Sequence, residues 1–462
     1  MFVPKSMMMA GSVIARCAQP ALQFHANPTG HMRVKHVSTV GRSPVPMPIS
    51  SDRVVRIPDR VAMHWRQGIV SMSTSPYVNF DAFLADSRAL AAKVLPAHIA
   101  QKISDTGRFG KGFLVVEGLP VDPHLPNTPA TPKEAVLSKK TFVSESVALG
   151  MSALLKCEPF NFRQESFGAA PLVDNVVPVR RYQTQKGAGG SAHNFPFHKE
   201  SAWHRLSPRY LLLKGLRQDH LGQAQTWISV LQDMMDKLPG HYRKALELPQ
   251  FSIGAPDLYS QMDAVGISMG TDREIKTPVI TYNARSGLPE LTVNFNNMFS
   301  DTKEGAKALI CLEHLCYQQA HVLHLRPDNL VIIDNRTTAH TRNGYSPRYD
   351  GQDRWFQRVN FQDQLWQENV IVSEDFSRIL GMSPDQAARL LSWLKESSFV
   401  DNEGRLTDVF SQTEQAMRRS ITEKSTIPVM AFFDFPSEYR SRCLEILDCL
   451  LTKGPVFPSR IV

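Results

Sequence analysis

The sequence predicts an α+β fold in which helices surround a β-sandwich or barrel core. Helical patterns come early in the chain, short β-branched runs bounded by glycine and proline fill its middle, and no internal repeat is found. The chain has 462 residues, of which 42% are hydrophobic and 21% are charged. This length and composition are typical of a globular protein with a sizeable core.

The first predicted elements are a helix, a strand and a second helix. Apolar residues at helical spacing begin at Asn79, in the stretch FDAFLADSRALAAKVLPAHIAQKI. The run GFLVVEGLP, residues 112–120, predicts a buried strand. Thr131 and Glu134 form a capping box around a proline, so a second helix is predicted from here to about Lys156.

The middle of the chain supplies the predicted core strands. After the glycine-rich loop QTQKGAGGSAHNF, residues 210–217 (YLLLKGLR) and 224–230 (AQTWISV) predict two strands. A capping box at 301–304 begins a helix that is expected to end near Gln319. Two further strands are predicted at LVIID and at RWFQRVNF, where the residue pattern alternates with period two.

The last part of the chain, from about Ser373, is again predicted to be mostly helical. From Ser373 onward, a serine followed by proline caps the helix MSPDQAARLLSWLKE, and SSFVDNEGRLTDVF predicts a hairpin. A helix with a hairpin resembles part of a winged-helix module, but no third helix with a basic face follows. We therefore interpret residues 371–462 as a mostly helical appendage on a main domain at residues 56–370.

Residues 1–55 are interpreted as a disordered leader or a targeting segment. No Asp or Glu precedes Asp52, whereas five Lys and Arg residues do. This composition also occurs in mitochondrial transit peptides, and MMMAGSVIA is similar to a weak signal-peptide core. We expect a cytoplasmic protein, with a mitochondrial location as the alternative.

Charge and cysteine content limit the classes of partner. The net charge of +8 comes from scattered Lys and Arg residues without a dense basic block, so nucleic acid is not expected as a partner. No apolar run is long enough to cross a bilayer, so no membrane association is expected. The six cysteines have no disulfide-scaffold or zinc-site spacing, and we expect them to be reduced.

A metal site is predicted from three residues. In FHKESAWH, His198 and Glu200 are two positions apart, so on an extended segment their side chains point to the same side. Alone, this pair is equally typical of an ordinary surface. His340 follows the predicted strand LVIID, and two histidines with one carboxylate are the ligand set of non-haem Fe(II) oxygenases. The neighbouring histidines are interpreted as structural or solvent-facing.

Two arginines follow the second histidine. On the alternating strand RWFQRVNF, Arg354 and Arg358 share one face with Phe356. Two arginines on the inward face of a core strand are unfavourable unless each meets an anion. A dicarboxylate cosubstrate and a substrate carboxylate would supply two anions. Structural ion pairs are the alternative interpretation.

Two segments carry a resemblance to a known family. HNFPFHKESAWHRLSPRYLLLKGLRQDHLGQAQTWISV and LVIIDNRTTAHTRNGYSPRYDGQDRWFQRV resemble the clavaminate synthase-like, TauD- and asparagine oxygenase-type Fe(II)/2-oxoglutarate-dependent oxygenases. That group uses His-x-Glu where most of the superfamily uses His-x-Asp. The resemblance covers about residues 80 to 365, and it implies a double-stranded β-helix (jelly-roll) core flanked by helices.

The resemblance implies roles for five residues in metal and cosubstrate binding. His198, Glu200 and His340 would bind Fe(II), and no other residue is assigned to catalysis. Arg354 would hold the distal carboxylate of 2-oxoglutarate in a bidentate pair, and Thr226 would donate a hydrogen bond to the same cosubstrate. O₂ is the second cosubstrate that the family uses, and ascorbate would serve as reductant.

The resemblance also implies where a substrate would bind. Arg358 matches the arginine that contacts the substrate α-carboxylate in amino-acid hydroxylases, and Glu165 lies where an acid would meet the α-amine. Side-chain selectivity is expected from the loop at residues 187–195 and from LTVNFNNMF, residues 291–299. That segment has asparagines where the arginine-hydroxylating relatives have acids, which favours a neutral polar substrate side chain over a cationic one.

The expected reaction is the oxidative decarboxylation of 2-oxoglutarate to succinate and CO₂, coupled to hydroxylation of an unactivated carbon. The substrate would be a small molecule, an amino acid or a derivative of one. Because Glu200 is a carboxylate, halogenation is disfavoured, while desaturation and cyclisation stay open. One alternative is a non-catalytic iron or 2-oxoglutarate sensor whose residues 371–462 bind a partner or DNA. Another is an oxygenase for protein, carrier-bound or sulfonate substrates. The oligomeric state is not predicted.

Overall fold

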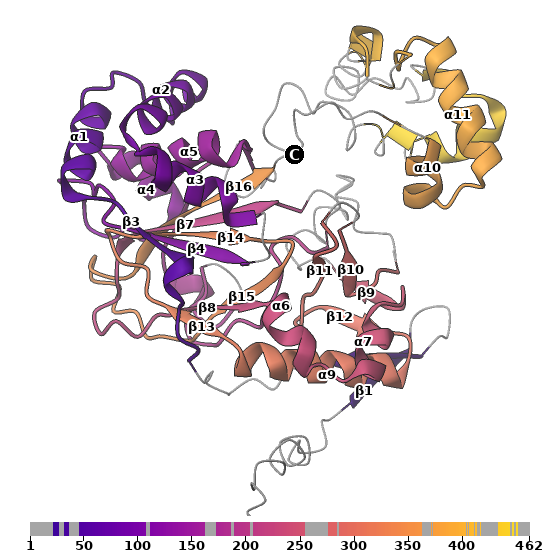
Figure 1. Ribbon diagram of the computed structural model, residues 1–462, viewed down its shortest axis with the longest axis horizontal. Helices are drawn as coiled ribbons and strands as arrows, with labels where there is room; N and C mark the ends of the chain where they lie inside the picture. Colours follow the sequence, from indigo (N-terminus) through magenta and orange to yellow (C-terminus); the bar gives the residue numbers. More distant parts are fainter. Residues whose placement is uncertain are drawn as a thin grey trace, which may run out of the picture.

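The computed structural model describes most of the chain between residues 46 and 410, with shorter stretches on either side (Figure 1). The described residues are 22–26, 32–36, 46–107, 111–161, 172–185, 189–203, 207–254, 276–283, 286–362, 371, 373–402, 404, 406–410, 412–413, 416, 433–443, 446–447 and 450.

A seven-stranded sheet lies at the centre of the fold. Six strands follow one another in the order β3, β4, β14, β7, β16 and β5, and β6 also pairs with β16. Four of them are core strands that the sequence predicts, namely β4, β14, β7 and β16. The bounds of the seven strands are Val54–Arg56 (β3), Phe113–Glu117 (β4), Glu158–Phe160 (β5), Asp174–Val176 (β6), Tyr210–Arg217 (β7), Leu330–Asp334 (β14) and Trp355–Gln362 (β16).

A smaller sheet packs against one face of the large one. It contains β13 (His321–Leu323), β8 (Thr226–Val230) and β15 (Thr338–Arg342) in that order. The two sheets share one apolar cluster, to which β4, β7 and β14 contribute residues such as Val115 and β8 contributes Ile228. Burial of these side chains between the sheets is the main force that holds them together.

Helices cover the other face of the large sheet (Figure 1). They are α1 (Asp59–Val70), α2 (Phe80–Val94), α3 (Ala97–Ser104) and α5 (Val143–Leu155). Because side chains alternate along a strand, Leu114, Val116 and Ile332 pack against these helices, while their neighbours Phe113 and Val115 point between the sheets. This mixed arrangement confirms the predicted α+β class.

Two helices are shorter than the sequence predicts. The pattern that begins at Asn79 forms α2 and α3, which are separated at Pro96 because proline disfavours helical backbone in the residue before it and lacks a donor. The helix expected from Thr131 to Lys156 forms α4 (Pro132–Ser138) and α5. The carboxylate of Asp122 caps the N-terminus of α5, because it accepts hydrogen bonds from the backbone N–H groups of Val143 and Ser144.

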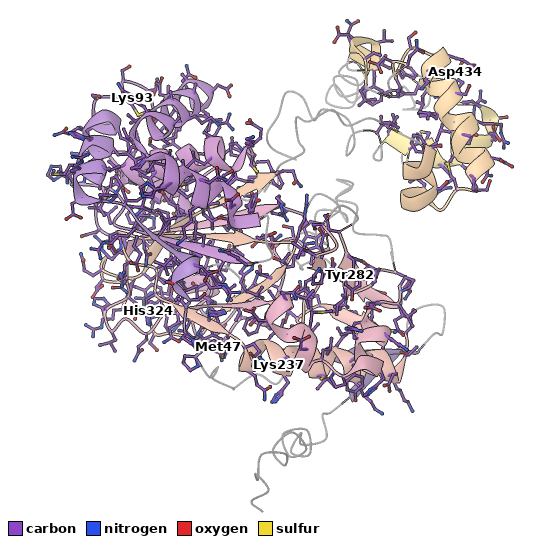
Figure 2. The ribbon with its side chains drawn as sticks, in the orientation of Figure 1. Met47, Lys93, Lys237, Tyr282, His324 and Asp434 are labelled. Atoms are coloured by element: carbon purple, nitrogen blue, oxygen red, sulfur yellow. The ribbon has the colours of Figure 1, made fainter. Side chains whose placement is uncertain are left out.

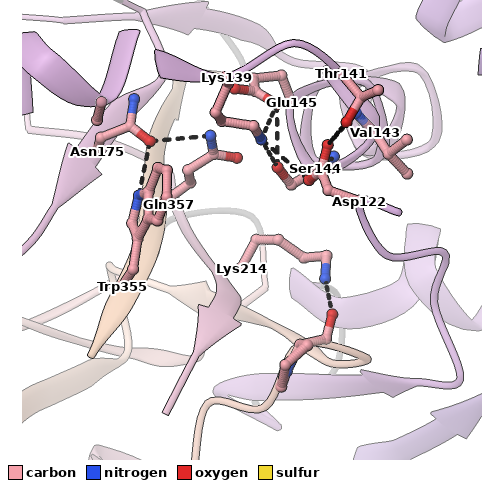
Figure 3. A network of polar contacts seen from close by, with 12 residues as sticks. Asp122, Lys139, Thr141, Val143, Ser144, Glu145, Asn175, Lys214, Trp355 and Gln357 are labelled. Atoms are coloured by element: carbon pink, nitrogen blue, oxygen red, sulfur yellow. Dashed lines mark hydrogen bonds and ion pairs between the residues drawn. The ribbon is translucent and has the colours of Figure 1, made fainter. Parts of the chain in front are cut away.

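A buried charge network holds the start of α5 (Figure 3). The Lys139 ammonium lies 3.0 Å from Asp122 Oδ2 and 2.7 Å from Glu145 Oε2, and the three side chains are 1%, 3% and 0% exposed. Burial disfavours the charged Asp122, but the ammonium and hydrogen bonds from Ser144 and Thr141 keep its pKa below the ordinary value. The network therefore replaces the water that these groups lose on folding.

The network continues to β6 and β16. Glu145 Oε1 accepts a hydrogen bond from the Tyr77 hydroxyl at 3.0 Å, and Asn175 Nδ2 donates to that hydroxyl at 3.3 Å. Asn175 Oδ1 in turn accepts from Trp355 Nε1 at 3.0 Å and from Gln357 Nε2 at 3.1 Å (Figure 3). A chain of polar contacts thus ties α5 to the two strands through their helix-facing side chains.

The remaining elements of the main body surround the small sheet. Helix α9 begins after Thr302, whose hydroxyl accepts from Gly305 N, close to the start that the sequence predicts. Strands β1 and β2 fall within the predicted leader and belong to a four-stranded sheet with the order β1, β2, β12 and β9, while β10 pairs with β11. The bounds are Leu22–Ala26 (β1), Met32–His36 (β2), Leu231–Met234 (α6), Gly240–Leu246 (α7), Phe251–Ile253 (β9), Ile280–Tyr282 (β10), Pro289–Leu291 (β11), Met298–Ser300 (β12) and Lys303–Gln318 (α9). Short 3-10 turns span Ser51–Arg53, Asp105–Gly107, Arg180–Tyr182, Met235–Lys237 and Ser437–Arg442.

Helices α10 (Ser373–Leu380) and α11 (Pro384–Glu396) lie in the predicted C-terminal appendage. Ser383 and Gln386 form a capping box at the start of α11, as the sequence predicts. These helices bury an apolar cluster of their own, whose members all lie beyond residue 370. Figure 2 shows charged side chains such as Lys93, Lys237 and Asp434 on the outside of the molecule.

Two further observations concern the described residues. Among them, no helix is both long and apolar enough to cross a bilayer. The four cysteines that lie in the described part of the chain, Cys157, Cys311, Cys316 and Cys443, are all free.

We predict that Lys139→Ala destabilises the protein. Removing the ammonium leaves the carboxylates of Asp122 and Glu145 buried without a cation, which costs about 3–5 kcal/mol. The free energy of unfolding, measured in urea, should fall by this amount, whereas Lys140→Ala removes an exposed neighbour and should change it little. Equal stabilities of the two variants would contradict the role given to the network.

Candidate metal centre

The two histidines of the predicted site lie directly opposite each other. His198 N donates to His340 O at 3.0 Å, and His340 N donates to His198 O at 2.9 Å. This antiparallel bridge adds residue 198 to the edge of the small sheet beside β15, and a second bridge joins it to Asn294. The imidazole rings therefore share a face, with centroids 4.4 Å apart.

Glu200 completes a cluster of potential metal ligands. One donor atom from each of His198, Glu200 and His340 lies within 4.8 Å of the other two, and Glu200 Oε2 is 3.8 Å from His340 Nε2. The side-chain amide of Asn335, directly after β14, fixes the Glu200 backbone: Glu200 N donates to Asn335 Oδ1 at 2.8 Å, and Asn335 Nδ2 donates to Glu200 O at 3.1 Å. The fold thus brings together three side chains that are up to 142 positions apart.

The chemistry of the cluster fits a divalent ion. His198 Nδ1 lies 3.0 Å from Pro196 O, and because a carbonyl only accepts, Nδ1 carries the proton and Nε2 keeps its lone pair. Burial lowers the pKa of both histidines, so they are neutral, as metal ligands must be. Buried His340 Nδ1 has no hydrogen-bond partner among the described residues. Two neutral imidazoles and a carboxylate suit non-haem iron.

A second cluster, made of His220, Asp350 and Asp353, fits a metal less well. His220 Nε2 lies 2.9 Å from Asp350 but 3.9 Å from Asp353. The carboxylate of Asp353 already accepts hydrogen bonds from the backbone N–H groups of Arg348 and Tyr349, and Asp350 accepts one from Gln352. These acids stabilise the loop that precedes β16. The sequence interpretation of His220 as structural or solvent-facing agrees with this.

Arg354 is a buried cation at the start of β16. It is 4% exposed, its Nη2 donates to Thr226 Oγ1 at 3.2 Å, and its guanidinium lies over the ring of Phe356 at 4.4 Å. No carboxylate of the described residues forms an ion pair with it. A buried guanidinium without an anion is unfavourable, so the geometry fits an anionic ligand. As the acceptor of the Arg354 bond, Thr226 keeps its own hydrogen for a ligand oxygen.

Arg358 lies between two carboxylates. Its Nη1 is 3.3 Å from both Glu200 oxygens, and its Nη2 is 2.9 Å from Asp174 Oδ2. Arg358 therefore adjoins the metal-ligand cluster, on the same side of β16 as Phe356, as the alternation predicts. Asp174 and Asn335 have no local sequence signal of a role at the site, because only the pairing of distant strands places them here.

The other predicted substrate residues are only partly described. Glu165 lies outside the described residues, as do residues 187 and 188 of the predicted selectivity loop. Asn294 of the second selectivity segment is bridged to His198 and is 9% exposed. Cross-strand partners share a face, so Asn294 lies next to the metal-ligand cluster.

Comparison with known proteins identifies the family. The profile described as "Taurine catabolism dioxygenase TauD, TfdA family" matches residues 109–360. The chain belongs to this family. It is therefore a dioxygenase, and the matched region contains the three residues of the metal-ligand cluster, buried Arg354 and partly buried Arg358.

Relatives of known activity cover most of the same region. L-asparagine oxygenase of Streptomyces coelicolor is 31% identical over 281 residues, which are 60% of this chain and 78% of the relative. Clavaminate synthase 2 of Streptomyces clavuligerus is 28% identical over 304 residues, 62% of this chain and 84% of the relative.

Solved structures agree with this relationship. A crystal structure of asparagine oxygenase with Fe(II), 2S,3S-3-hydroxyasparagine and succinate has a TM-score of 0.59 at 27% identity. The match covers 69% of this chain and 96% of that one. The non-haem iron oxygenase OrfP, solved with Fe and α-ketoglutaric acid, has a TM-score of 0.58 at 22% identity, covers 68% of this chain and 96% of its own, and shows the same fold.

We predict that His340→Ala abolishes Fe(II) binding without unfolding the protein. The cluster loses one of its ligands, and the two that remain hold a metal poorly. Anaerobic Fe(II) binding by calorimetry, with circular dichroism to check the fold, measures both effects. His241→Ala removes an exposed histidine and is the matched control. Unchanged Fe(II) affinity in His340→Ala would contradict the ligand assignment.

We also predict that Arg354→Lys weakens 2-oxoglutarate binding by about 10- to 100-fold, because one ammonium cannot reproduce the planar fork of a guanidinium. Titration of the Fe(II)-loaded protein with 2-oxoglutarate measures the affinity. Arg326→Lys changes an exposed arginine and should leave it unaltered. An unchanged affinity in Arg354→Lys would assign the cosubstrate carboxylate to another cation.

Proposed function

We propose that the protein hydroxylates an unactivated carbon of a free amino acid with a neutral polar side chain, with release of succinate and CO₂. The observation that carries this proposal is the pairing of a 2-His-1-carboxylate cluster with a buried arginine that forms no ion pair among the described residues. The enzyme uses Fe(II), 2-oxoglutarate and O₂, and ascorbate is the expected reductant. Relatives that carry amino-acid substrates in their names support the substrate class.

Different residues bind the metal, the cosubstrate and the substrate. His198, Glu200 and His340 would hold Fe(II), which supplies O₂ activation and the oxidative decarboxylation of 2-oxoglutarate when it is bound. Arg354 binds the distal carboxylate of the cosubstrate, and Thr226 donates a hydrogen bond to it. Thr226 lies on β8 and Arg354 directly precedes β16, so the carboxylate is held at a fixed place relative to the cluster.

Arg358 and Asn294 orient the substrate in this proposal. Arg358 binds the α-carboxylate from β16, and Glu165 remains the proposed partner of the α-amine. Asn294, bridged to His198, offers an amide where an acid would favour a cationic side chain. A neutral amide or hydroxyl on the substrate can both donate to and accept from this amide. L-asparagine is therefore the first amino acid to test.

Three broader features belong to the same proposal. We infer that the two sheets form a double-stranded β-helix (jelly roll) at residues 56–370, since the small sheet and the His198 bridge lie against the large sheet. Residues 371–462 form a mostly helical appendage with its own core. We propose a leader or targeting segment within residues 1–55, ahead of β3 (Val54–Arg56), and a cytoplasmic location with mitochondria as the alternative.

We predict that one free amino acid stimulates succinate release. The purified protein is assayed with Fe(II), ascorbate and 2-oxoglutarate against a panel of free amino acids, with mass detection of one added oxygen. Amino acids with neutral polar side chains, L-asparagine first, should stimulate succinate release, and lysine and arginine should not. Stimulation by a peptide, a carrier-bound amino acid or a sulfonate alone would replace the substrate class. Binding of 2-oxoglutarate without any turnover would favour a sensor instead.

A further inference from the structure

Arg354 lies just ahead of the regular strand pairing of β16. The pairing of β16 with β6 begins at Phe356, and its pairing with β7 shifts register between Trp355 and Phe356. Regular pairing on both sides therefore starts two residues after Arg354. Because an irregular ladder does not by itself fix the backbone next to it, other contacts must hold the chain at Arg354.

The loop that precedes α4 supplies such contacts. Thr128 N donates to Gly351 O at 2.7 Å, and Thr128 Oγ1 donates to Asp353 O at 2.6 Å. Asp353 is 2% exposed, and its carbonyl belongs to the peptide group that joins it to Arg354. Thr128 thus holds the peptide group from which the Arg354 side chain begins.

Arg217, the last residue of β7, binds the same two loops. Its Nη1 donates to Thr128 Oγ1 at 2.7 Å and to Gly351 O at 3.0 Å, and its Nη2 donates to Pro126 O at 3.0 Å. Among the described residues Arg217 forms no ion pair, so its planar fork serves to join the loops and not to balance a charge. We call Thr128 and Arg217 the loop clamp.

The backbones of both clamped loops are restricted. Two prolines flank Thr128 and fix φ at their positions. The Asp353 carboxylate accepts hydrogen bonds from the backbone N–H groups of Arg348 and Tyr349 at 2.8 and 2.6 Å, which closes its loop. The Arg354 guanidinium lies at the end of a long side chain, so a small change of backbone direction displaces it further than the backbone itself moves.

We infer that Thr128 is a positioning residue for the cosubstrate, because together with Arg217 it fixes the backbone of Arg354. The guanidinium then lies where it can bind both Thr226 and the distal carboxylate of 2-oxoglutarate. The inference rests on the proposed function, which assigns that carboxylate to Arg354. It adds a residue that acts on cosubstrate affinity through Arg354.

The test measures binding of 2-oxoglutarate to the Fe(II)-loaded, full-length protein by anaerobic calorimetry. Thr128→Val keeps the size of the side chain and removes the hydroxyl, whereas Thr128→Ser keeps the hydroxyl. Thr74→Val is the matched control, because it removes a hydroxyl that donates to Asp86 in another part of the fold. The measurement needs no amino-acid substrate, so it does not depend on which substrate the enzyme uses.

The Kd for 2-oxoglutarate should rise about tenfold in Thr128→Val, because the variant loses both hydrogen bonds of the hydroxyl and Arg354 is displaced. In Thr128→Ser and Thr74→Val it should stay close to the wild-type value. The Kd for Fe(II) should not change in any of these variants. A wild-type Kd for 2-oxoglutarate in Thr128→Val would overturn the inference. So would an equal loss of Fe(II) affinity, since Thr128 would then support the fold in general.

A double-mutant cycle shows whether Thr128 acts through Arg354. If it does, Thr128→Val should raise the Kd for 2-oxoglutarate much less in the Arg354→Lys background than in the wild type, because the fork that it positions is gone. Equal effects in the two backgrounds would contradict the inference. Arg217→Gln removes the other half of the loop clamp and should also raise this Kd. If Thr128→Val does not fold, an unchanged Kd in Arg217→Gln is the result that overturns the inference.

Failure of the proposed function gives a different pattern of results. If Arg354→Lys binds 2-oxoglutarate as tightly as the wild type, the cosubstrate carboxylate belongs to another cation, and the inference fails with that assignment. If Arg354→Lys weakens binding while Thr128→Val and Arg217→Gln do not, only the inference fails and the proposed function stands.

Discussion

The two reciprocal hydrogen bonds between His198 and His340 are the constraint on which the site depends. They fix two backbones that are 142 positions apart in the chain, so both imidazoles must project from the same face of the small sheet. Glu200 then follows by alternation along its own segment, and Asn335 holds that segment to the end of β14. The ligand cluster is therefore set by backbone pairing more than by contacts between the ligands themselves.

The buried charges on the two sides of β16 differ in whether they are paired. Behind β16, Lys139, Asp122 and Glu145 satisfy one another in a closed network. In front of it, Arg354 contacts the Thr226 hydroxyl and aromatic rings but forms no ion pair with a carboxylate of the described residues. A network that is complete stabilises one structure, while a buried charge without its counter-ion is stabilised only when a ligand supplies one. β16 therefore lies between the paired network of Lys139, which stabilises the fold, and Arg354, which is available to a ligand.

Most core strands and the metal ligands could be predicted from the sequence, because each is marked by a pattern of neighbouring residues. The strands at 113–117, 210–217, 330–334 and 355–362 are continuous apolar or alternating runs, and His198, Glu200 and His340 have types that only a few chemistries share. The break between α4 and α5 was not predictable in this way. It depends on Asp122, which reaches the new helix from a loop before α4 and has no local signal of its role.

Asp174 illustrates the same limit at the site. Nothing in LVDNVVP marks it as a partner of Arg358, because the contact exists only once β6 pairs with β16. Family resemblance supplied Arg354, Arg358 and Thr226 because their positions follow recognisable segments. Residues outside such segments carry no such label, and they are found only through the register of strands that are distant in the sequence.

The lone charge of Arg354 has a consequence for the protein in its natural setting. A ligand that binds only the folded state raises the free energy of unfolding in proportion to the logarithm of its concentration above Kd. A dicarboxylate metabolite that neutralises this guanidinium thus acts as part of the fold, and the folded fraction of the protein rises and falls with its supply. Resistance of the purified protein to proteolysis would then rise with the concentration of that dicarboxylate.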